Sequence, residues 1–263
     1  MEIFNAILLG AIQGVTEFLP VSSSGHLLLM KHFLDMGEVP ILFDVLLHIA
    51  TLLVVLGFFR RQIFSILRAL WHWVQKSIDT EDAYYLRLTV VIIIATVFTV
   101  LLGFILNTVD SLHTTSSVSV MFILTGLLLI STKFVKSRED QTPKKRNGIL
   151  VGIAQGLGTL PGISRSGITI TAALWGGIDR EKAGELSFLL SIPAILGAFI
   201  LEIGESGTLT SQMHISAILI GCLSAIISGI LSLKLLLWLI RSGKLYFFSI
   251  YLIPLGIIGL IWL

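Results

Sequence analysis

A polar segment near the beginning of the chain carries the side chains best suited to chemistry. It places one carboxylate, three consecutive hydroxyls, a glycine and an imidazole between strongly apolar runs. In order, its candidate residues are Gln13, Glu17, Ser22, Ser23, Ser24, Gly25 and His26. A carboxylate can hold a metal or orient a nucleophile, and an imidazole can act as an acid, a base or a nucleophile near neutral pH.

A second polar segment repeats the first one in the other half of the chain. When Gln13 is aligned with Gln155, the further pairs are Gly14 with Gly156, Ser22 with Ser164, Ser23 with Arg165, Ser24 with Ser166 and Gly25 with Gly167. A broken helix at this point would expose backbone N–H groups that bind anions, and Arg165 would add a permanent bidentate donor. The two segments therefore suit a phosphate site built from two halves.

Structural roles stay open for these same residues. Any of the three consecutive serines could cap the start of a helix. His26 could be a hydrogen-bonded structural histidine, and Arg165 could anchor a helix end, although its depth in the chain's apolar run argues against this. Gln13 and Gln155 could join neighbouring helices by hydrogen bonds.

Asp44, His48 and Glu185 are further ionisable residues in apolar stretches. Asp44 and Glu185 begin corresponding stretches, where we expect a helix cap or a partner of the helix dipole. His48 follows Asp44 by one helical turn. We expect it to face the core or an internal space rather than to bind a ligand.

The composition is that of an integral membrane protein. The 263 residues are 55% hydrophobic and 13% charged, with a mean hydropathy of +0.95, whereas soluble domains carry about 25% charged residues. The single cysteine, Cys222, excludes a disulfide framework and a Cys-based metal site. A net charge of +2 gives no reason to expect a nucleic-acid partner, and the beginning of the chain lacks the features of a removable signal peptide.

Six stretches are long and apolar enough to cross a bilayer, for which about 20 residues are needed. They cover roughly 41–59, 86–106, 117–135, 183–203, 214–240 and 246–263. Two further regions, 3–33 and 148–176, are apolar but are interrupted by the two polar segments. Each half of such a region is too short to cross, so we predict two re-entrant helix pairs whose turns are covered by protein or water.

The distribution of Lys and Arg supports re-entrance for both regions. With both re-entrant, nearly all the basic residues of the loops fall on one side, and the other side has only Lys31. The positive-inside rule assigns the basic side to the cytoplasm. We therefore expect both termini outside, in an inner (plasma) membrane protein whose site opens to the outer, periplasmic face.

These assignments predict an all-α, polytopic fold with an inverted-topology repeat. Each half, 1–135 and 148–263, would be a re-entrant helix pair followed by three transmembrane helices. The two polar segments would meet near the midplane, as in many transporters. Residues 136–147 would form a charged cytoplasmic linker, and 60–85 a cytoplasmic connector lying on the membrane interface.

The two motifs resemble those of the undecaprenyl-diphosphate phosphatase family of the bacitracin-resistance type. The resemblance covers nearly the whole chain and includes the run from Glu185 to Pro193. It implies an inverted-repeat membrane fold with two re-entrant helix pairs. It also implies hydrolysis of undecaprenyl diphosphate to undecaprenyl phosphate and inorganic phosphate, which recycles the carrier lipid of cell-wall synthesis and confers bacitracin resistance. The implied cofactor is a divalent cation, Mg²⁺ or Ca²⁺.

The resemblance also implies roles for residues. The family's acidic pair falls on Gln13 and Glu17, and its Ser, His and Arg fall on Ser23, His26 and Arg165. We predict that the catalytic residues are Glu17, Ser23, His26 and Arg165, with Glu17 as the metal ligand. We predict substrate binding by Gln13, Ser22, Ser24, Gly25, Gln155, Ser164, Ser166 and Gly167. The nucleophile stays open between His26, which we favour slightly, Ser23 and water.

One departure from the family pattern affects the metal site. The first residue of the acidic pair is often Glu, and this chain has Gln13 there. An amide is a weaker metal ligand than a carboxylate and cannot act as a base. Glu17 would therefore have to provide most of the metal binding and the base.

A transporter or lipid flippase is the rival interpretation, because broken helices meeting at the midplane are typical of secondary transporters. A combined phosphatase and flippase is the third. The expected partners are a polyprenyl diphosphate lipid and the bilayer itself. The sequence leaves a homodimer and a monomer equally open.

Overall fold

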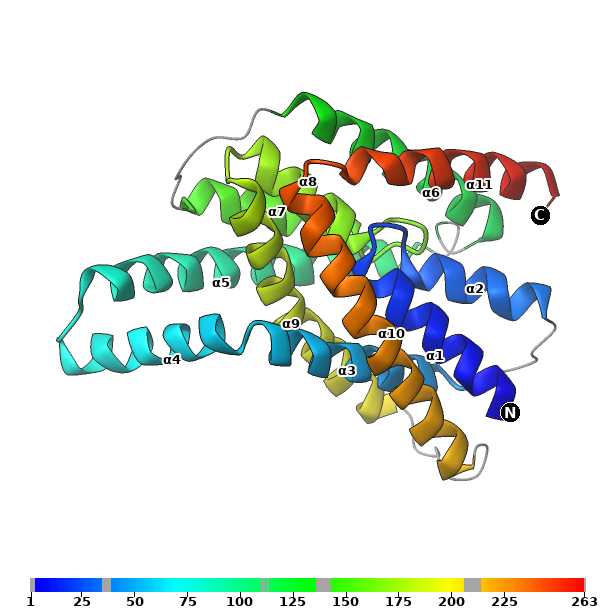
Figure 1. Cartoon of the computed structure of the whole chain (residues 1–263), viewed down its shortest axis with the longest axis horizontal. Coiled ribbons are helices and arrows are strands. Elements are labelled where there is room, and N and C mark those ends of the chain that lie inside the picture. Colours follow the sequence, from blue (N-terminus) through cyan, green and yellow to red (C-terminus); the bar gives the residue numbers. More distant parts are fainter. Residues whose placement is uncertain are drawn as a thin grey trace.

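The computed structural model describes residues 3–34, 39–109, 112, 114–135, 143–205 and 214–262 (Figure 1). These residues form helices and no strand. Six of the helices in this described part are long and apolar enough to cross a bilayer. The chain is a multi-pass membrane protein.

The long helices agree with the predicted spans to within a few residues at most ends. They are α3 (Ile41–Phe58), α5 (Thr80–Asn107), α6 (Thr115–Ser131), α9 (Arg180–Glu205), α10 (Ile215–Arg241) and α11 (Ser249–Trp262). Short 3₁₀ turns, η2 (Thr132–Phe134) and η3 (Leu245–Phe248), extend α6 and precede α11. The largest difference is at α5, which begins six residues before the predicted span because Asp79 caps it.

Four shorter helices occupy the two interrupted regions. They are α1 (Ile3–Phe18), α2 (Ser23–Phe33), α7 (Lys145–Leu157) and α8 (Arg165–Trp175). Their lengths are 16, 11, 13 and 11 residues, so none is long enough to cross a bilayer alone. Each interrupted region is thus a helix–turn–helix, and its polar segment forms the end of the first helix, the turn and the start of the second.

Serine caps begin the second helix of each pair. The hydroxyl of Ser22 accepts a hydrogen bond from the N–H of Gly25, and the hydroxyl of Ser164 accepts one from the N–H of Gly167. The capping role considered for the serines is therefore present at the corresponding positions Ser22 and Ser164. Between the two helices of the second pair, Gly162 has a φ of 93°, and a Cβ there would lie 2.5 Å from the carbonyl oxygen of Val118. A side chain at this turn would be both strained and obstructed.

Close helix packing surrounds the two pairs. Helix α1 packs along α10, α7 packs along α5, and α6 packs along α11 (Figure 1). The α1–α10 contact is close because a Cβ at Gly14 would lie only 2.1 Å from the hydroxyl oxygen of Ser228. In the aligned position of α7, a Cβ at Gly156 would lie 2.6 Å from the Cβ of Leu102 on α5. Both first helices thus pack by glycine against a long helix.

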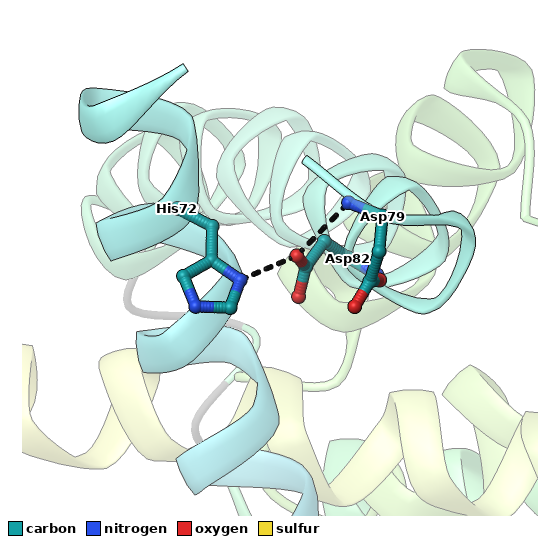
Figure 2. A group of neighbouring side chains, drawn as sticks. All are labelled: His72, Asp79 and Asp82. Atoms are coloured by element: carbon teal, nitrogen blue, oxygen red, sulfur yellow. Dashed lines mark hydrogen bonds and ion pairs between the residues drawn. The ribbon is translucent and has the colours of Figure 1, made fainter. Parts of the chain in front are cut away.

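The connector expected at 60–85 is largely helical. Helix α4 (Arg60–Gln75) packs against α5, and the two helices form a long hairpin (Figure 1). Figure 2 shows the side chains at its tip: Asp82 Oδ2 accepts hydrogen bonds from His72 Nδ1 at 2.6 Å and from the N–H of Asp79 at 3.2 Å. Asp79 in turn accepts from the N–H of Asp82 at 2.7 Å, which completes a capping box.

The linker between the halves is only partly described. Residues 136–142 of the predicted linker lie outside the described residues. Helix α7 begins at Lys145, which is inside the range 136–147 predicted for the linker. The N-terminal end of α1 and the C-terminal end of α11 lie toward the same side of the molecule in Figure 1.

Candidate active site

A cavity of about 430 Å³ joins the two polar segments. From the first segment it is lined by Glu17, Ser22, Ser23 and Ser24. From the second it is lined by Gln155, Ser164 and Arg165. Four threonines and His48 complete its polar part: Thr16, Thr96, Thr99 and Thr159 supply the hydroxyls.

Glu17 is the centre of the polar network. Its Oε2 accepts a hydrogen bond from Ser23 Oγ at 2.7 Å and one from Gln13 Nε2 at 3.1 Å. Its Oε1 accepts from the guanidinium of Arg165, with which it forms an ion pair. The side chain of Glu17 is only 6% exposed, and the opposite charge of Arg165 compensates for its burial.

Arg165 lies at the first position of α8, directly after the cap Ser164. The first N–H groups of a helix lack intrahelical acceptors, and the helix dipole adds positive potential there. Thr125 of α6 fixes this turn, because its hydroxyl donates to the carbonyl of Gly162 at 3.1 Å and accepts from the N–H of Ser164 at 3.2 Å. The second segment thus presents an anion-binding helix start beside a guanidinium.

Two hydrogen bonds tie the turns of the two halves to each other. The N–H of Gly162 donates to the hydroxyl of Ser22 at 3.0 Å, and the hydroxyl of Ser166 donates to the carbonyl of Phe18 at 3.1 Å. Ser22 itself has a φ of 71°, a left-handed conformation that is rare for serine. Such local strain is kept where the surrounding structure enforces it.

Four residues predicted to bind substrate do not line the cavity: Gln13, Gly25, Ser166 and Gly167. Gln13 is buried within α1. Gly25 packs against Phe122, Gly167 packs beneath Pro20, and Ser166 is buried with its hydroxyl on Phe18. Their visible role is to allow the turns to approach closely. The lining residues Ser22, Ser24, Ser164 and Gln155 are better placed to reach a ligand.

His26 does not line the cavity, although its sequence position suggested chemistry. Its Nδ1 donates to the carbonyl of Ser22 at 2.8 Å, and its Nε2 pairs with the hydroxyl of Tyr251 at 2.7 Å. The ring stacks on Tyr251 and meets the edge of Phe122. Both nitrogens therefore have partners, as the structural interpretation of His26 expects, and its catalytic role stays a prediction.

His48 is the ionisable residue that the sequence interpretation underrated. It lines the cavity, and its Nε2 lies 3.5 Å from Oε2 of Glu17. Its Nδ1 donates to the carbonyl of Asp44 at 2.8 Å, which turns Nε2 toward the cavity. The signal in the sequence was an ionisable side chain in the middle of a span, which is costly without a function. Asp44 itself pairs with Lys31.

The two corresponding glutamines have different surroundings. Gln155 donates from Nε2 to the hydroxyl of Thr99 on α5 at 3.3 Å and to the carbonyl of Leu190 on α9 at 3.5 Å. It joins helices, as one interpretation of the sequence expected. Gln13 donates only within its own helix, to Glu17.

The oxygen atoms near Glu17 fit a hard divalent cation that takes most of its ligands from a substrate. Oε1 of Gln13 is buried and accepts no hydrogen bond from the described residues, which leaves it available as a ligand. Of the described residues, Glu17 is the sole carboxylate in the cavity wall, and Mg²⁺ commonly uses one or two carboxylates together with phosphate oxygens. Among the described residues, His72, Asp79 and Asp82 are also of metal-ligating types, but none of them lines this cavity. Asp79 and Asp82 form the capping box of α5, and His72 of α4 donates to Asp82.

Comparison with known proteins agrees with the geometry. The profile of the family described as "Bacitracin resistance protein BacA" matches residues 6–258. An undecaprenyl-diphosphatase from Treponema denticola is 45% identical over 98% of this chain and 96% of its own length. Proteins with the same name from Borrelia recurrentis and Carboxydothermus hydrogenoformans are 40% and 39% identical over at least 96% of each chain. With a match this extensive, the chain belongs to the bacitracin resistance protein BacA family.

Proposed function

We propose that this protein is an undecaprenyl-diphosphate phosphatase. It hydrolyses the terminal phosphate of undecaprenyl diphosphate, recycles the carrier lipid of cell-wall synthesis and thereby confers bacitracin resistance. The observation that carries the proposal is the contact between Glu17 and Arg165 in a cavity that Ser23 also lines. The names of the similar proteins describe the same activity.

The architecture we propose is an inverted repeat with two re-entrant helix pairs. The packing of the helices supports this, because contacts occur in corresponding pairs: α1 with α10 corresponds to α7 with α5, and α3 with α10 corresponds to α9 with α5. The paired glycines Gly14 and Gly156, each packed closely on a long helix, support it at residue level.

The orientation we propose follows from charge. Apart from Lys31, the basic residues of the loops lie on the side assigned to the cytoplasm, and the chain ends lie outside the plasma membrane. In Figure 1 the N-terminal end of α1 and the C-terminal end of α11 lie toward the same side of the molecule, which supports this arrangement. The cavity then opens toward the outer face, where the diphosphate head of the lipid lies. Whether two copies associate stays a prediction.

Binding of the diphosphate uses the second segment. The guanidinium of Arg165 can place two parallel N–H donors on the phosphate oxygens, and the first N–H groups of α8 add neutral donors. The substrate phosphate competes with Glu17 for Arg165, so binding replaces an internal ion pair by an intermolecular one. Such donors stabilise the charge that develops on the transferred phosphoryl group.

Ser23 is the nucleophile we propose, because its hydroxyl lines the cavity while the ring of His26 does not. The Oγ–P bond to the terminal phosphorus forms, and the bond from that phosphorus to the bridging oxygen breaks, which releases undecaprenyl phosphate. The hydroxyl proton passes to Glu17, whose Oε2 already accepts it at 2.7 Å. Water then hydrolyses the phosphoserine and releases inorganic phosphate.

The remaining polar residues hold these groups in position. His48 lies beside Oε2 of Glu17, and the Ser22 cap sets the start of α2, on which Ser23 is the first residue. His26 braces the same turn through the carbonyl of Ser22. Glu17 would hold Mg²⁺ or Ca²⁺, and Gln13, whose Nε2 donates to Glu17, has an Oε1 that is unpaired among the described residues and could serve as a second oxygen ligand. Such a cation, when bound, neutralises charge on the diphosphate oxygens.

Phosphate release in detergent tests the proposal against the flippase interpretation. Detergent micelles have no compartments, so transport cannot produce a signal. Purified protein should release phosphate from a polyprenyl diphosphate, chelator should abolish the release, and Glu17→Gln should be nearly inactive. If wild-type protein releases no phosphate with Mg²⁺ or Ca²⁺ present, the enzyme proposal is wrong and the transporter interpretation takes its place.

A further inference from the structure

The cavity has two chemically different parts, and the second of these is apolar. Beyond the polar groups, its wall is built from the C-terminal halves of α5 and α9. Val100, Gly103 and Phe104 supply the α5 side, and Ala194, Gly197 and Leu201 are among the residues of the α9 side. Apart from Gly103 and Gly197, which have no side chains, these are hydrocarbon groups with no hydrogen-bonding atoms.

This apolar wall is open to the surroundings. Phe104 is 63% exposed and Leu201 is 60% exposed, although both line the cavity. A Cβ added at Gly197 would meet no atom within 4 Å, so the space beside this lining residue of α9 is open. Exposed apolar side chains in the middle of membrane spans face lipid. The cavity is therefore continuous with the bilayer through a seam between α5 and α9, defined here by Val100, Gly103, Phe104, Ala194, Gly197 and Leu201.

A polyprenyl substrate requires such an opening. A site of about 430 Å³ is of the size that encloses a drug-sized ligand, and a long polyprenyl chain is much larger. The head can reach Glu17 and Arg165 only if most of the tail stays outside the cavity. Because the tail is a hydrocarbon, its lowest-energy path runs through an apolar wall into lipid.

We infer that the polyprenyl tail leaves the active site through the α5–α9 seam and that its first isoprene units lie against Val100, Phe104 and Leu201. This inference rests on the proposed function, because it concerns the lipid of that reaction. In the proposed orientation both C-terminal halves lie in the outer leaflet, so the seam admits lipid from that leaflet without moving the head through the protein.

A second apolar groove is the rival path. It has a volume of about 520 Å³ and is lined by Met121, Leu124, Leu127 and Trp175, among others. Leu160 and Ile163 line both this groove and the cavity, and their side chains separate the two spaces. The seam has no such partition, which is why the structure favours it.

A pair of matched glycine variants tests the seam. Gly197 and Gly57 are both exposed glycines of long apolar helices, and a Cβ at either would meet no atom within 4 Å, but Gly57 does not line the cavity. Gly197→Trp should lower kcat/KM for a long-chain polyprenyl diphosphate at least 10-fold. It should change kcat/KM for methyl diphosphate, which has no isoprene unit, less than 3-fold. Gly57→Trp should match wild type with both substrates.

Two results of this comparison would overturn the inference: wild-type activity of Gly197→Trp with the long chain, or an equal loss with both substrates. If wild-type protein cleaves neither substrate, the proposed function itself fails. If it cleaves only the long chain, or neither, photo-crosslinking decides the path independently of turnover.

In that experiment, the probe is a long-chain polyprenyl diphosphate with a diazirine on its first isoprene unit. Excess unlabelled lipid should suppress the specific labelling. We expect the label on residues 100–104 and 194–201, and label on residues 121–131 or on Trp175 would show that the tail uses the other groove. Absence of any label that unlabelled lipid suppresses would also count against the seam.

Discussion

The guanidinium of Arg165 donates a hydrogen bond to the carboxylate of Glu17 across the two halves of the chain. This contact places one negative and one positive side chain in the same cavity, each with little exposure. A substrate phosphate must compete with Glu17 for Arg165. The binding energy of the diphosphate is thus partly used to separate an existing ion pair, and the predictions below follow from this arrangement.

Replacing Glu17 should separate binding from chemistry. At saturating Mg²⁺, Glu17→Gln removes the charge that competes for Arg165, so KM should not rise, whereas the Mg²⁺ concentration for half-maximal activity should rise because a cation ligand is lost. The loss of the carboxylate that takes the Ser23 proton should lower kcat by about 10²–10⁴-fold. Steady-state phosphate release gives both constants. A rise in KM with unchanged kcat would mean that Glu17 only binds substrate.

Replacing Arg165 by Lys should be severe. A lysine keeps the charge but loses the planar pair of donors, and loss of one such stabilising contact typically costs about 10²–10³-fold in rate. Arg241→Lys is the matched control, because Arg241 pairs with Glu181 on an exposed surface. Activity of Arg165→Lys near that of the control would argue against a phosphate clamp.

Replacing Ser23 should abolish turnover, and its neighbour supplies the control. Ser23→Ala should lower kcat by more than about 10³-fold, as expected for a nucleophile. Ser24→Ala should lose less than 10-fold, because the hydroxyl of Ser24 pairs with that of Ser22 rather than with Glu17. Acid quenching during turnover of a substrate labelled at its terminal phosphate should trap labelled phosphoserine on Ser23. Phosphohistidine is acid-labile, so a parallel alkaline quench is needed, and a label on His26 in that sample would instead restore the choice favoured by the sequence.

Replacing His48 should show whether its Nε2 supports Glu17 as a donor, which requires a hydrogen on both ring nitrogens because Nδ1 already donates to the carbonyl of Asp44. His48→Ala removes the group beside Oε2, and we expect about a 10-fold or larger loss of kcat. His48→Gln can place an amide N–H in a similar position and should recover most of that loss. The same measurement on both variants is sufficient, since equal activities of Ala and Gln would exclude a donor role.

Changing Gln13 should alter the dependence on the divalent cation. Gln13→Glu provides a second carboxylate, so the Mg²⁺ concentration for half-maximal phosphate release should fall by roughly 10-fold. Gln155→Glu, at the corresponding position of the second half, should give no such gain because that side chain is held by Thr99 and Leu190. An unchanged Mg²⁺ requirement in Gln13→Glu would place the cation elsewhere.

Much of the fold could be predicted from the sequence because hydrophobic length is a strong signal. The six spans were predictable from apolar runs, and the helix breaks at Pro20 and Pro161 from residues that cannot continue a helix. The meeting of Glu17 with Arg165 could be expected from the repeat. The helical form of 60–75 was not predicted. Its polar and apolar residues recur at helical spacing, so it contains no continuous apolar run of the kind that marks the spans.

The orientations of the two histidines could not be predicted. The ring of His26 points away from the cavity because it packs against Phe122 and Tyr251, which are distant in sequence. His48 turns toward it because the carbonyl of Asp44 holds its other nitrogen and α3 packs beside α1. Both outcomes depend on which helices become neighbours, and residue spacing carries no direct information on that.

The hydrogen bonds between the two turns have a consequence for biosynthesis. The hydroxyl of Ser22 accepts a hydrogen bond from the N–H of Gly162, and the carbonyl of Phe18 accepts one from the hydroxyl of Ser166. The chain is made from its N-terminus, so the first polar turn is synthesised well before these partners exist. During that interval the turn must stay hydrated or be held by other molecules, because lipid cannot satisfy its polar groups. Assembly of the site is therefore a late event, completed when the second turn reaches the first.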